Sequence, residues 1–148
     1  MVSVDDIKKL RELSGAGIAD CREALEATKG DMSKASEYLA KKGVEKAVKK
    51  GDRETRNGLV FSYVHGGKIG VVVNLLCETD FVTKTEDFQN LGREVALQIA
   101  SMDPKNVEEL LEQANIRDSK ITISDMVKSV IGKLGENIKI GEFARIKI

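Results

Sequence analysis

The sequence lacks an excess of charge, long apolar runs and any grouping of its cysteines. Its 24 Lys and Arg balance 24 Asp and Glu, so no net electrostatic field draws the whole protein to nucleic acid or to an anionic membrane. No apolar run approaches the roughly 20 residues of a membrane-spanning helix, and the first ten residues lack the pattern of a signal peptide. Cys21 and Cys77 are far apart without CxxC spacing, which indicates neither a zinc site nor a disulfide framework. We expect a cytoplasmic protein with no membrane segment, no metal and two reduced thiols.

Motifs for catalysis and for nucleotide binding are also missing. The single histidine, His65, has no cysteine partner at a recognisable spacing, so a Cys–His hydrolase is not indicated. No phosphate-binding loop or dinucleotide-binding glycine pattern occurs, and the "GAG" at 15–17 is too short to cradle a phosphate. We expect no enzyme activity, no cofactor and no direct binding of nucleotide.

What the chain does contain is enough apolar sequence for an ordinary core, with 41% hydrophobic residues. Helical periodicity runs through the first 43 residues, and breaks at "SGAG" (14–17) and "KGD" (29–31) divide it into three helices. Asp31 is the expected N-cap of the third helix, which should end before Gly43. The residues expected to face inward are Val4, Ile7, Leu10, Leu13 or Ser14, Ile18, Cys21, Ala24, Leu25, Met32, Ala35, Tyr38 and Leu39. Residues 1–50 are predicted to form a three-helix module.

A basic stretch, "KKGVEKAVKKGDRETR", occupies residues 41–56. One interpretation is a solvated, partly helical linker, because runs of charge commonly mark solvated surface. The other is a patch that contacts phosphates, for example of RNA, but the interleaved aromatics typical of such patches are absent. We place the linker at residues 51–57 and do not expect nucleic acid as a partner.

From Gly58 the apolar pattern changes to the alternation of strands. The runs "LVFSYVH" (59–65) and "KIGVVVNLLC" (68–77) flank Gly66-Gly67. This predicts an antiparallel hairpin of Gly58–His65 with Lys68–Cys77, joined by a tight two-residue turn.

Three helices and a last strand are predicted after the hairpin. The helices should begin at Thr83, with Glu86 at capping-box spacing, at Asp103, and at Thr122 or Ser124. Their inward residues are expected to be Phe88, Leu91, Val95 and Ile99, then Val107, Leu110 and Leu111, then Val127, Val130, Ile131 and Leu134. In the last strand one face should hold Ile138, Ile140, Ala144, Ile146 and Ile148, with Lys139, Arg145 and Lys147 pointing outward. Residues 51–148 are thus predicted to form a core domain, a small antiparallel sheet covered by helices in an α+β fold.

Phe81, in "CETDFV" (77–82), has no place in these patterns. It lies between the second strand and the following helix, outside the stripe that begins at Phe88, and it does not occupy the position of a hydrophobic staple. The residues alone leave two interpretations open, a core residue or an exposed anchor. An exposed phenylalanine beside Asp80 at a strand-to-helix corner would have the make-up of an interface hot spot.

Several stretches, taken together, resemble the elongation factor Ts family. The two that resemble its signature sequences are "KKLRELSGAGIADCREAL" (8–25) and "VNLLCETDFV" (73–82). Agreement extends, in the same order, to "GDRETRNGLVFSYVH", "FQNLGREVALQIASMDP" and "IGKLGENI". The resemblance therefore covers nearly the whole chain.

The resemblance implies a guanine-nucleotide exchange factor that promotes GDP release from elongation factor Tu and needs no catalytic side chain. It implies that the N-terminal module is similar to ubiquitin-associated domains and docks on the partner's nucleotide-binding domain, as does the corner that holds Phe81. Phe81 would wedge near the partner's nucleotide and magnesium site. The partner-binding residues at matching positions are Arg11, Ile18 and Ala19 on the module, and Thr79, Asp80, Phe81 and Val82 at the corner.

Three features depart from the family pattern. Ile18-Ala19 stands where many relatives have Met-Met, so we expect a weaker contact there. The stretch between Met102 and the last helix is short, so the second core half and coiled-coil arm of the longest relatives are absent. Short relatives work as homodimers in which two cores share a sheet, so a homodimer is one expected state of this chain. The terminal strand lacks the paired arginines that relatives often have, which leaves its role in contacts open.

The main alternative is a ubiquitin-associated-like binding module joined to an unrelated core that touches RNA through residues 41–56. That hypothesis predicts RNA binding that weakens with salt, and no effect on any GTPase.

Overall fold

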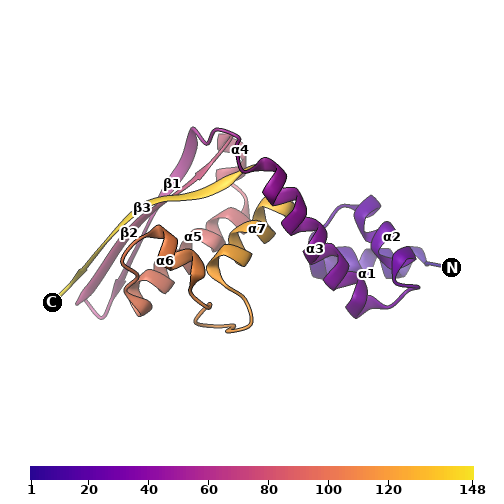
Figure 1. Ribbon diagram of the computed structural model, residues 1–148, viewed down its shortest axis with the longest axis horizontal. Helices are drawn as coiled ribbons and strands as arrows, with labels where there is room; N and C mark the ends of the chain where they lie inside the picture. Colours follow the sequence, from indigo (N-terminus) through magenta and orange to yellow (C-terminus); the bar gives the residue numbers. More distant parts are fainter.

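A computed structural model describes all 148 residues as an α+β fold with one three-stranded antiparallel sheet (Figure 1). The helices are α1 (Val4–Ser14), α2 (Ile18–Ala27), α3 (Met32–Lys50), α4 (Asp80–Thr83), α5 (Glu86–Met102), α6 (Val107–Glu112) and α7 (Ile123–Leu134). The strands are β1 (Asn57–His65), β2 (Ile69–Cys77) and β3 (Ile138–Lys147), in the spatial order β1-β2-β3. The predicted fold class is confirmed.

The first three helices enclose a small apolar core of their own. α1 ends at Gly15, whose φ of 69° is the left-handed conformation that glycine adopts readily. Asp31 is the N-cap of α3, as predicted, and its carboxylate accepts a hydrogen bond from the Lys34 N–H. The residues buried in this core are Ile7, Leu10, Cys21, Ala24, Leu25 and Ala35.

Two predicted inward residues of these helices are exposed instead, and of the alternatives Leu13 and Ser14 the partly buried one is Ser14. Val4, Leu13 and Ile18 are each more than half exposed. Val4 and Ile18 are the first residues of their helices and Leu13 is the last but one. These three positions lie at helix ends, beyond the small core that the helices enclose, so the apolar stripes are exposed there.

Helix α3 is longer than predicted and joins the two parts of the molecule. It continues past Gly43 to Lys50, because the residues around this single glycine are good helix formers and its second half packs against α7. Ala47 belongs to the larger apolar core, together with sheet residues. The expected helix end before Gly43 is therefore wrong, and most of the basic stretch is the second half of α3.

Two glycines meet where α3 crosses α7. A Cβ built at Gly132 would lie 2.7 Å from the Cα of Gly43, closer than real Cβ atoms come to other heavy atoms. The two backbones therefore approach each other without an intervening side chain. This crossing fixes the direction in which α3 leaves the core.

β1 and β2 form the predicted antiparallel hairpin, with His65 opposite Ile69. The turn holds one residue more than predicted, because Lys68 lies within it and donates its N–H to the His65 carbonyl. Gly66 and Gly67 have φ values of 56° and 68°, in the left-handed region that glycine adopts at little steric cost. The inward face of β2 is buried and consists of Val71, Val73, Leu75 and Cys77.

The predicted start of α5 is wrong by two residues. Its N-cap is Thr85, whose hydroxyl accepts a hydrogen bond from the Phe88 N–H. Thr83 instead ends the separate one-turn helix α4, and its hydroxyl donates to the Asp80 carbonyl. The inward stripe of α5 is nevertheless as predicted, since Phe88, Leu91, Val95 and Ile99 are all buried.

The later helices follow the predicted pattern except at one start. Asp103 ends α5 in a left-handed conformation, and Asn106 is the N-cap of α6. Thr122 caps α7 through a complete capping box with Asp125, one of the two starts that the sequence offered. Gly135 ends α7.

A bulge in β3 reverses the faces of its second half. Leu75 pairs with Ile140 while Val73 pairs with Phe143, so β3 has one residue more than β2 between these pairs. The Asn74 side chain accepts the Glu142 N–H (2.6 Å) and so satisfies the backbone at the bulge.

The bulge overturns part of the predicted alternation in β3. Ile138 and Ile140 are buried as predicted. Beyond the bulge Arg145 turns inward, where its guanidinium donates to the Ala100 carbonyl, and Ile146 is 73% exposed. One extra residue exchanges the two faces because side chains alternate along a strand.

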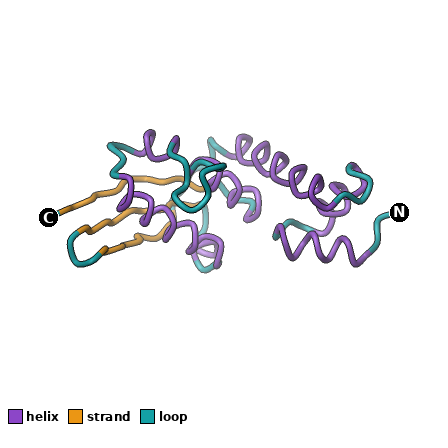
Figure 2. Tube along the Cα trace, turned by 90° about the horizontal axis from the view of Figure 1, so that it is seen from below, coloured by secondary structure: helices purple, strands orange, loops and turns teal.

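The molecule is elongated, with the chain termini at opposite ends (Figures 1 and 2). α5 packs against β1 and β2, and α6 and α7 pack against β3. These helices lie on one side of the sheet, and no element of the chain covers the other side (Figure 1). We call this uncovered side the open sheet face; its exposed apolar residues are Val60, Val64, Val72 and Ile146.

Candidate functional site

Phe81 stands at the surface on the one-turn helix α4. Its side chain is 76% exposed, whereas Phe88 is fully buried and Phe61 and Phe143 are half-buried against the core. Of the two interpretations that the sequence left open, the structure therefore shows the exposed one. An apolar ring held in water on a short, fixed element is free to enter a partner's pocket.

The neighbours of Phe81 fix the backbone of this corner. Val82 is buried in the larger core, and Thr83 is buried beside it. The Thr83 hydroxyl donates to the Asp80 carbonyl (2.5 Å), and the Lys84 N–H donates to the Phe81 carbonyl (3.3 Å). Asp80 and Phe81 face solvent, while Val82 anchors the turn and its side chain is not available at the surface.

Thr79, the N-cap of α4, is held by a residue from the far end of the chain. The Glu136 carboxylate accepts the Thr79 N–H (2.9 Å) with one oxygen and the Thr79 hydroxyl (2.6 Å) with the other. Because the hydroxyl points to Glu136, it makes no capping bond to α4. Thr79 is thus tied to the segment that follows α7.

The adjacent residues add a second set of bonds. Glu78 accepts the Asn137 N–H (3.0 Å) and pairs with Arg53 (3.7 Å). The buried Asn137 amide donates to the carbonyls of Gly51 (3.3 Å) and Arg53 (2.8 Å). We call Glu78, Thr79, Glu136 and Asn137 the corner clamp. It joins the end of β2, the start of β3 and the residues that follow α3.

The other predicted contact residues lie on the N-terminal helices. Arg11, Ile18 and Ala19 are all exposed, and Leu13 is exposed near them. Arg11 lies in the last turn of α1, and Ile18 and Ala19 are the first two residues of α2, so these positions flank the α1–α2 turn. The structure therefore presents two exposed sets, this one and the α4 corner, joined through α3.

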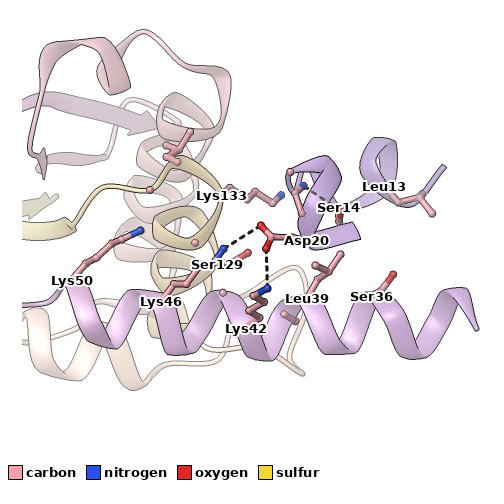
Figure 3. A pocket seen from close by; sticks show the side chains of 17 residues that line it. Leu13, Ser14, Asp20, Ser36, Leu39, Lys42, Lys46, Lys50, Ser129 and Lys133 are labelled. Carbon is pink, nitrogen blue, oxygen red and sulfur yellow. Dashed lines mark hydrogen bonds and ion pairs between the residues drawn. The ribbon is translucent and has the colours of Figure 1, made fainter. Parts of the chain in front are cut away.

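A cleft of about 640 Å³ separates the α1–α2 turn from α7, with α3 as its floor. Figure 3 shows Lys42 and Lys46 reaching from α3 to Asp20, and Lys133 extending from α7 toward the end of α1. The Asp20 carboxylate lies 2.9 Å from Lys42 Nζ and 3.1 Å from Lys46 Nζ. Lys42 also pairs with Glu23 (2.7 Å).

These ion pairs join α2 to α3 and shift the pKa values of the side chains that form them. The hydrogen bond from Lys42 lowers the pKa of Asp20, and hydrogen bonds from Lys42 and Tyr38 lower the pKa of Glu23. The bonds to Glu23 and Asp20 raise the pKa of Lys42. Two lysines of the basic stretch are thus already matched by carboxylates of the chain itself.

No arrangement typical of catalysis appears. Both cysteines are buried and free, and burial raises the pKa of the Cys77 thiol to about 11, with the Glu136 charge adding to the effect. His65 stacks on Tyr63 at the tip of the hairpin. No group of three His, Cys, Asp or Glu residues has the geometry of a metal site, and no helix is long and apolar enough to span a bilayer.

Comparison with known proteins identifies the family. A family profile described as Elongation factor TS matches residues 78–148. Elongation factor Ts from Fervidobacterium nodosum is 40% identical, with 99% of this chain and 98% of that protein aligned. Elongation factor Ts from Leptospira biflexa has the same identity and coverage. The chain belongs to the elongation factor Ts family. It is therefore an elongation factor of protein biosynthesis.

Members of the elongation factor Ts family carry sequence that this chain lacks. The alignment with the Fervidobacterium nodosum protein runs over 193 positions, more than the 148 residues here. Elongation factor Ts from Rippkaea orientalis is 38% identical over 97% of this chain but only 77% of its own length. That the missing part lies between Met102 and α7 remains a prediction.

Sequence reasoning missed the corner clamp. Glu136 and Asn137 lie in "IGKLGENI", which supported the elongation factor Ts resemblance but received no role. The available signal was the pair of polar residues directly before a strand that begins with a buried isoleucine, since Asn137 is itself 2% exposed. A buried polar side chain requires partners.

Proposed function

We propose that this chain is a guanine-nucleotide exchange factor that promotes release of GDP from elongation factor Tu in the cytoplasm. Phe81 would enter the partner near its nucleotide and magnesium site, while the surface at Arg11, Ile18 and Ala19 docks on the same domain. The observation that carries this proposal is the 76% exposed Phe81 on a corner whose backbone is bonded on both sides. Family membership supports the choice of partner.

The proposed mechanism needs no catalytic side chain. A protein that binds the nucleotide-free partner more tightly than the nucleotide-bound partner must weaken nucleotide binding by the same factor, because coupling between two ligands is reciprocal. A rigid apolar side chain suits this role, since little conformational entropy is lost when it enters a pocket.

Release of a fluorescent GDP analogue from bacterial elongation factor Tu tests the proposal. The analogue is chased with excess GDP in a stopped-flow instrument, with and without this protein. We expect faster release in proportion to the protein added, up to a plateau. No acceleration by folded protein would exclude exchange activity on this partner.

The RNA-binding alternative has less support in the structure. Lys42 and Lys46 face carboxylates rather than solvent alone, and the second half of α3 packs on α7. Binding to RNA that falls steeply with salt, in the absence of exchange activity, would favour this alternative.

A second copy of the chain is a further proposed partner. The open sheet face exposes valines at positions 60 and 72 to 72% and 49%, and a sheet with one uncovered apolar face is suited to pair with another. We expect a concentration-dependent dimer, twice the 16.2 kDa of one chain.

Sedimentation velocity over a range of concentrations measures this association. Val60→Lys should shift the equilibrium to the monomer, because a charge would be buried between the two sheets. Val48→Lys is the matched control, since Val48 is 68% exposed and belongs to helix α3 rather than to the open sheet face. A wild type that stays monomeric at every concentration, or equal behaviour of the two variants, would exclude pairing through this face.

A further inference from the structure

Glu136 makes the only side-chain hydrogen bonds that reach the start of α4 from a distant part of the chain. Its two carboxylate oxygens accept both hydrogen-bond donors of Thr79, at 2.9 and 2.6 Å. Hydrogen bonds to a charged acceptor are roughly twice as strong as neutral ones. Glu136 and Thr79 are 57 residues apart in the chain, so the contact is formed only in the folded protein.

The α4 corner needs such a contact because it has little stability of its own. α4 is a single turn of four residues without a side-chain cap, and so short a helix is not stable in isolation. The Phe81 ring is 76% exposed and receives little support from packing, so its placement depends mainly on the backbone. That backbone is held by burial of Val82 on one side and by Glu136 on the other.

Glu136 is itself firmly placed. It follows Gly135, the C-cap of α7, and precedes Asn137, whose backbone and side chain are bonded to Glu78, Gly51 and Arg53. The corner clamp therefore holds Thr79 in a fixed position relative to α7 and to the residues after α3. The same α7 meets α3 at the glycine crossing.

We propose that Glu136 is a positioning residue for Phe81, which orients the α4 corner for the partner without touching the partner itself. This inference rests on the proposed exchange function. It predicts that removal of the Glu136 carboxylate lowers nucleotide-exchange activity only through its effect on Phe81. It also predicts that Glu136 protects the backbone amides of residues 79–83 from hydrogen–deuterium exchange in the free protein. This effect does not depend on any partner.

A double-mutant cycle tests the inference. Glu136→Ala should lower the acceleration of GDP release about tenfold in the wild-type background, and it should have no further effect in a Phe81→Ala background. Non-additivity of this kind is expected when one residue acts through another. Glu136→Gln should retain part of the activity, because its amide oxygen can still accept the Thr79 N–H. Glu112→Ala, which removes an exposed glutamate of α6, should leave activity unchanged.

Hydrogen–deuterium exchange of the free variants provides the partner-independent readout. Glu136→Ala should raise the exchange rate of amides in residues 79–83 at least tenfold, while those of α5 stay protected. Unchanged protection at 79–83, or equal loss of activity in both backgrounds, would overturn the inference. If Glu136→Ala does not fold, Glu136→Gln is compared in the same two measurements and must show the smaller effects in the same direction. Wild-type protein that fails to accelerate GDP release would refute the proposed function. Hydrogen–deuterium exchange of the amides of residues 79–83 would then decide by itself whether Glu136 positions the corner.

Discussion

Phe81→Ala is expected to reduce the acceleration of GDP release from elongation factor Tu about thirtyfold while the protein stays folded. Truncation of a hot-spot side chain costs about 2 kcal/mol or more of binding free energy, and a tenfold change corresponds to about 1.4 kcal/mol. The free energy of unfolding should change by less than about 0.5 kcal/mol, because the ring is 76% exposed and leaves no cavity.

The matched control is Phe88→Ala, seven positions later on helix α5 and buried in the core. Phe88 is fully buried, so its truncation should lower the free energy of unfolding by about 3–5 kcal/mol. Urea denaturation measures both variants beside the stopped-flow assay. A Phe81→Ala protein that unfolds like Phe88→Ala, or one that keeps full exchange activity, would contradict the wedge assignment. Asp80→Ala should have a smaller effect on folding, since Asp80 is exposed.

Gly132→Ala should destabilise the crossing of α3 and α7. The added Cβ would lie 2.7 Å from Gly43 Cα and 3.1 Å from Gly43 O, and these are backbone atoms that cannot rotate away. The helices would have to move apart, which costs about 1–3 kcal/mol in a packed interface. We expect a lower midpoint in thermal and urea unfolding.

Gly43→Ala is the control at the same crossing. A Cβ built there has its nearest neighbour, Gly132 Cα, at 3.9 Å, an ordinary contact. Because alanine favours the helix by about 1 kcal/mol over glycine, this variant should be as stable as the wild type or more so. Equal destabilisation by both substitutions would show that the crossing is not as close on the Gly132 side as the structure indicates.

The helices and strands were predictable where one local signal dominated. The stripe from Phe88 to Ile99 and the Gly66-Gly67 hairpin each combine periodicity with a clear break. The start of α5 was not predictable, because both Thr83 and Thr85 precede acidic residues and can cap a helix. Only burial of Val82 and Thr83 in the folded protein selects Thr85 and leaves α4 as a separate turn.

The faces of β3 and the corner clamp depend on contacts that sequence spacing does not encode. The alternation in "NIKIGEFARIKI" is regular, and the bulge that breaks it is filled by Asn74 of another strand. The clamp joins Thr79 to Glu136 across most of the core domain. Among the predicted contact residues, the sequence pattern singled out Phe81 because it lies outside the helix stripe. Its exposure could not be predicted, because it depends on the tertiary fold leaving the ring uncovered.

Helix α3 sets the distance and the angle between the two exposed sets of predicted contact residues. Its 19 residues span about 28 Å at 1.5 Å per residue. One residue inserted between Leu39 and Gly43 would rotate the N-terminal helices by about 100° around the α3 axis relative to the sheet. Arg11 and Phe81 would then face different directions. Seven inserted residues, close to two turns, would restore the angle but add about 10 Å to the separation. The number of residues in one helix therefore sets the shape of any partner that can touch both exposed sets of this protein at once.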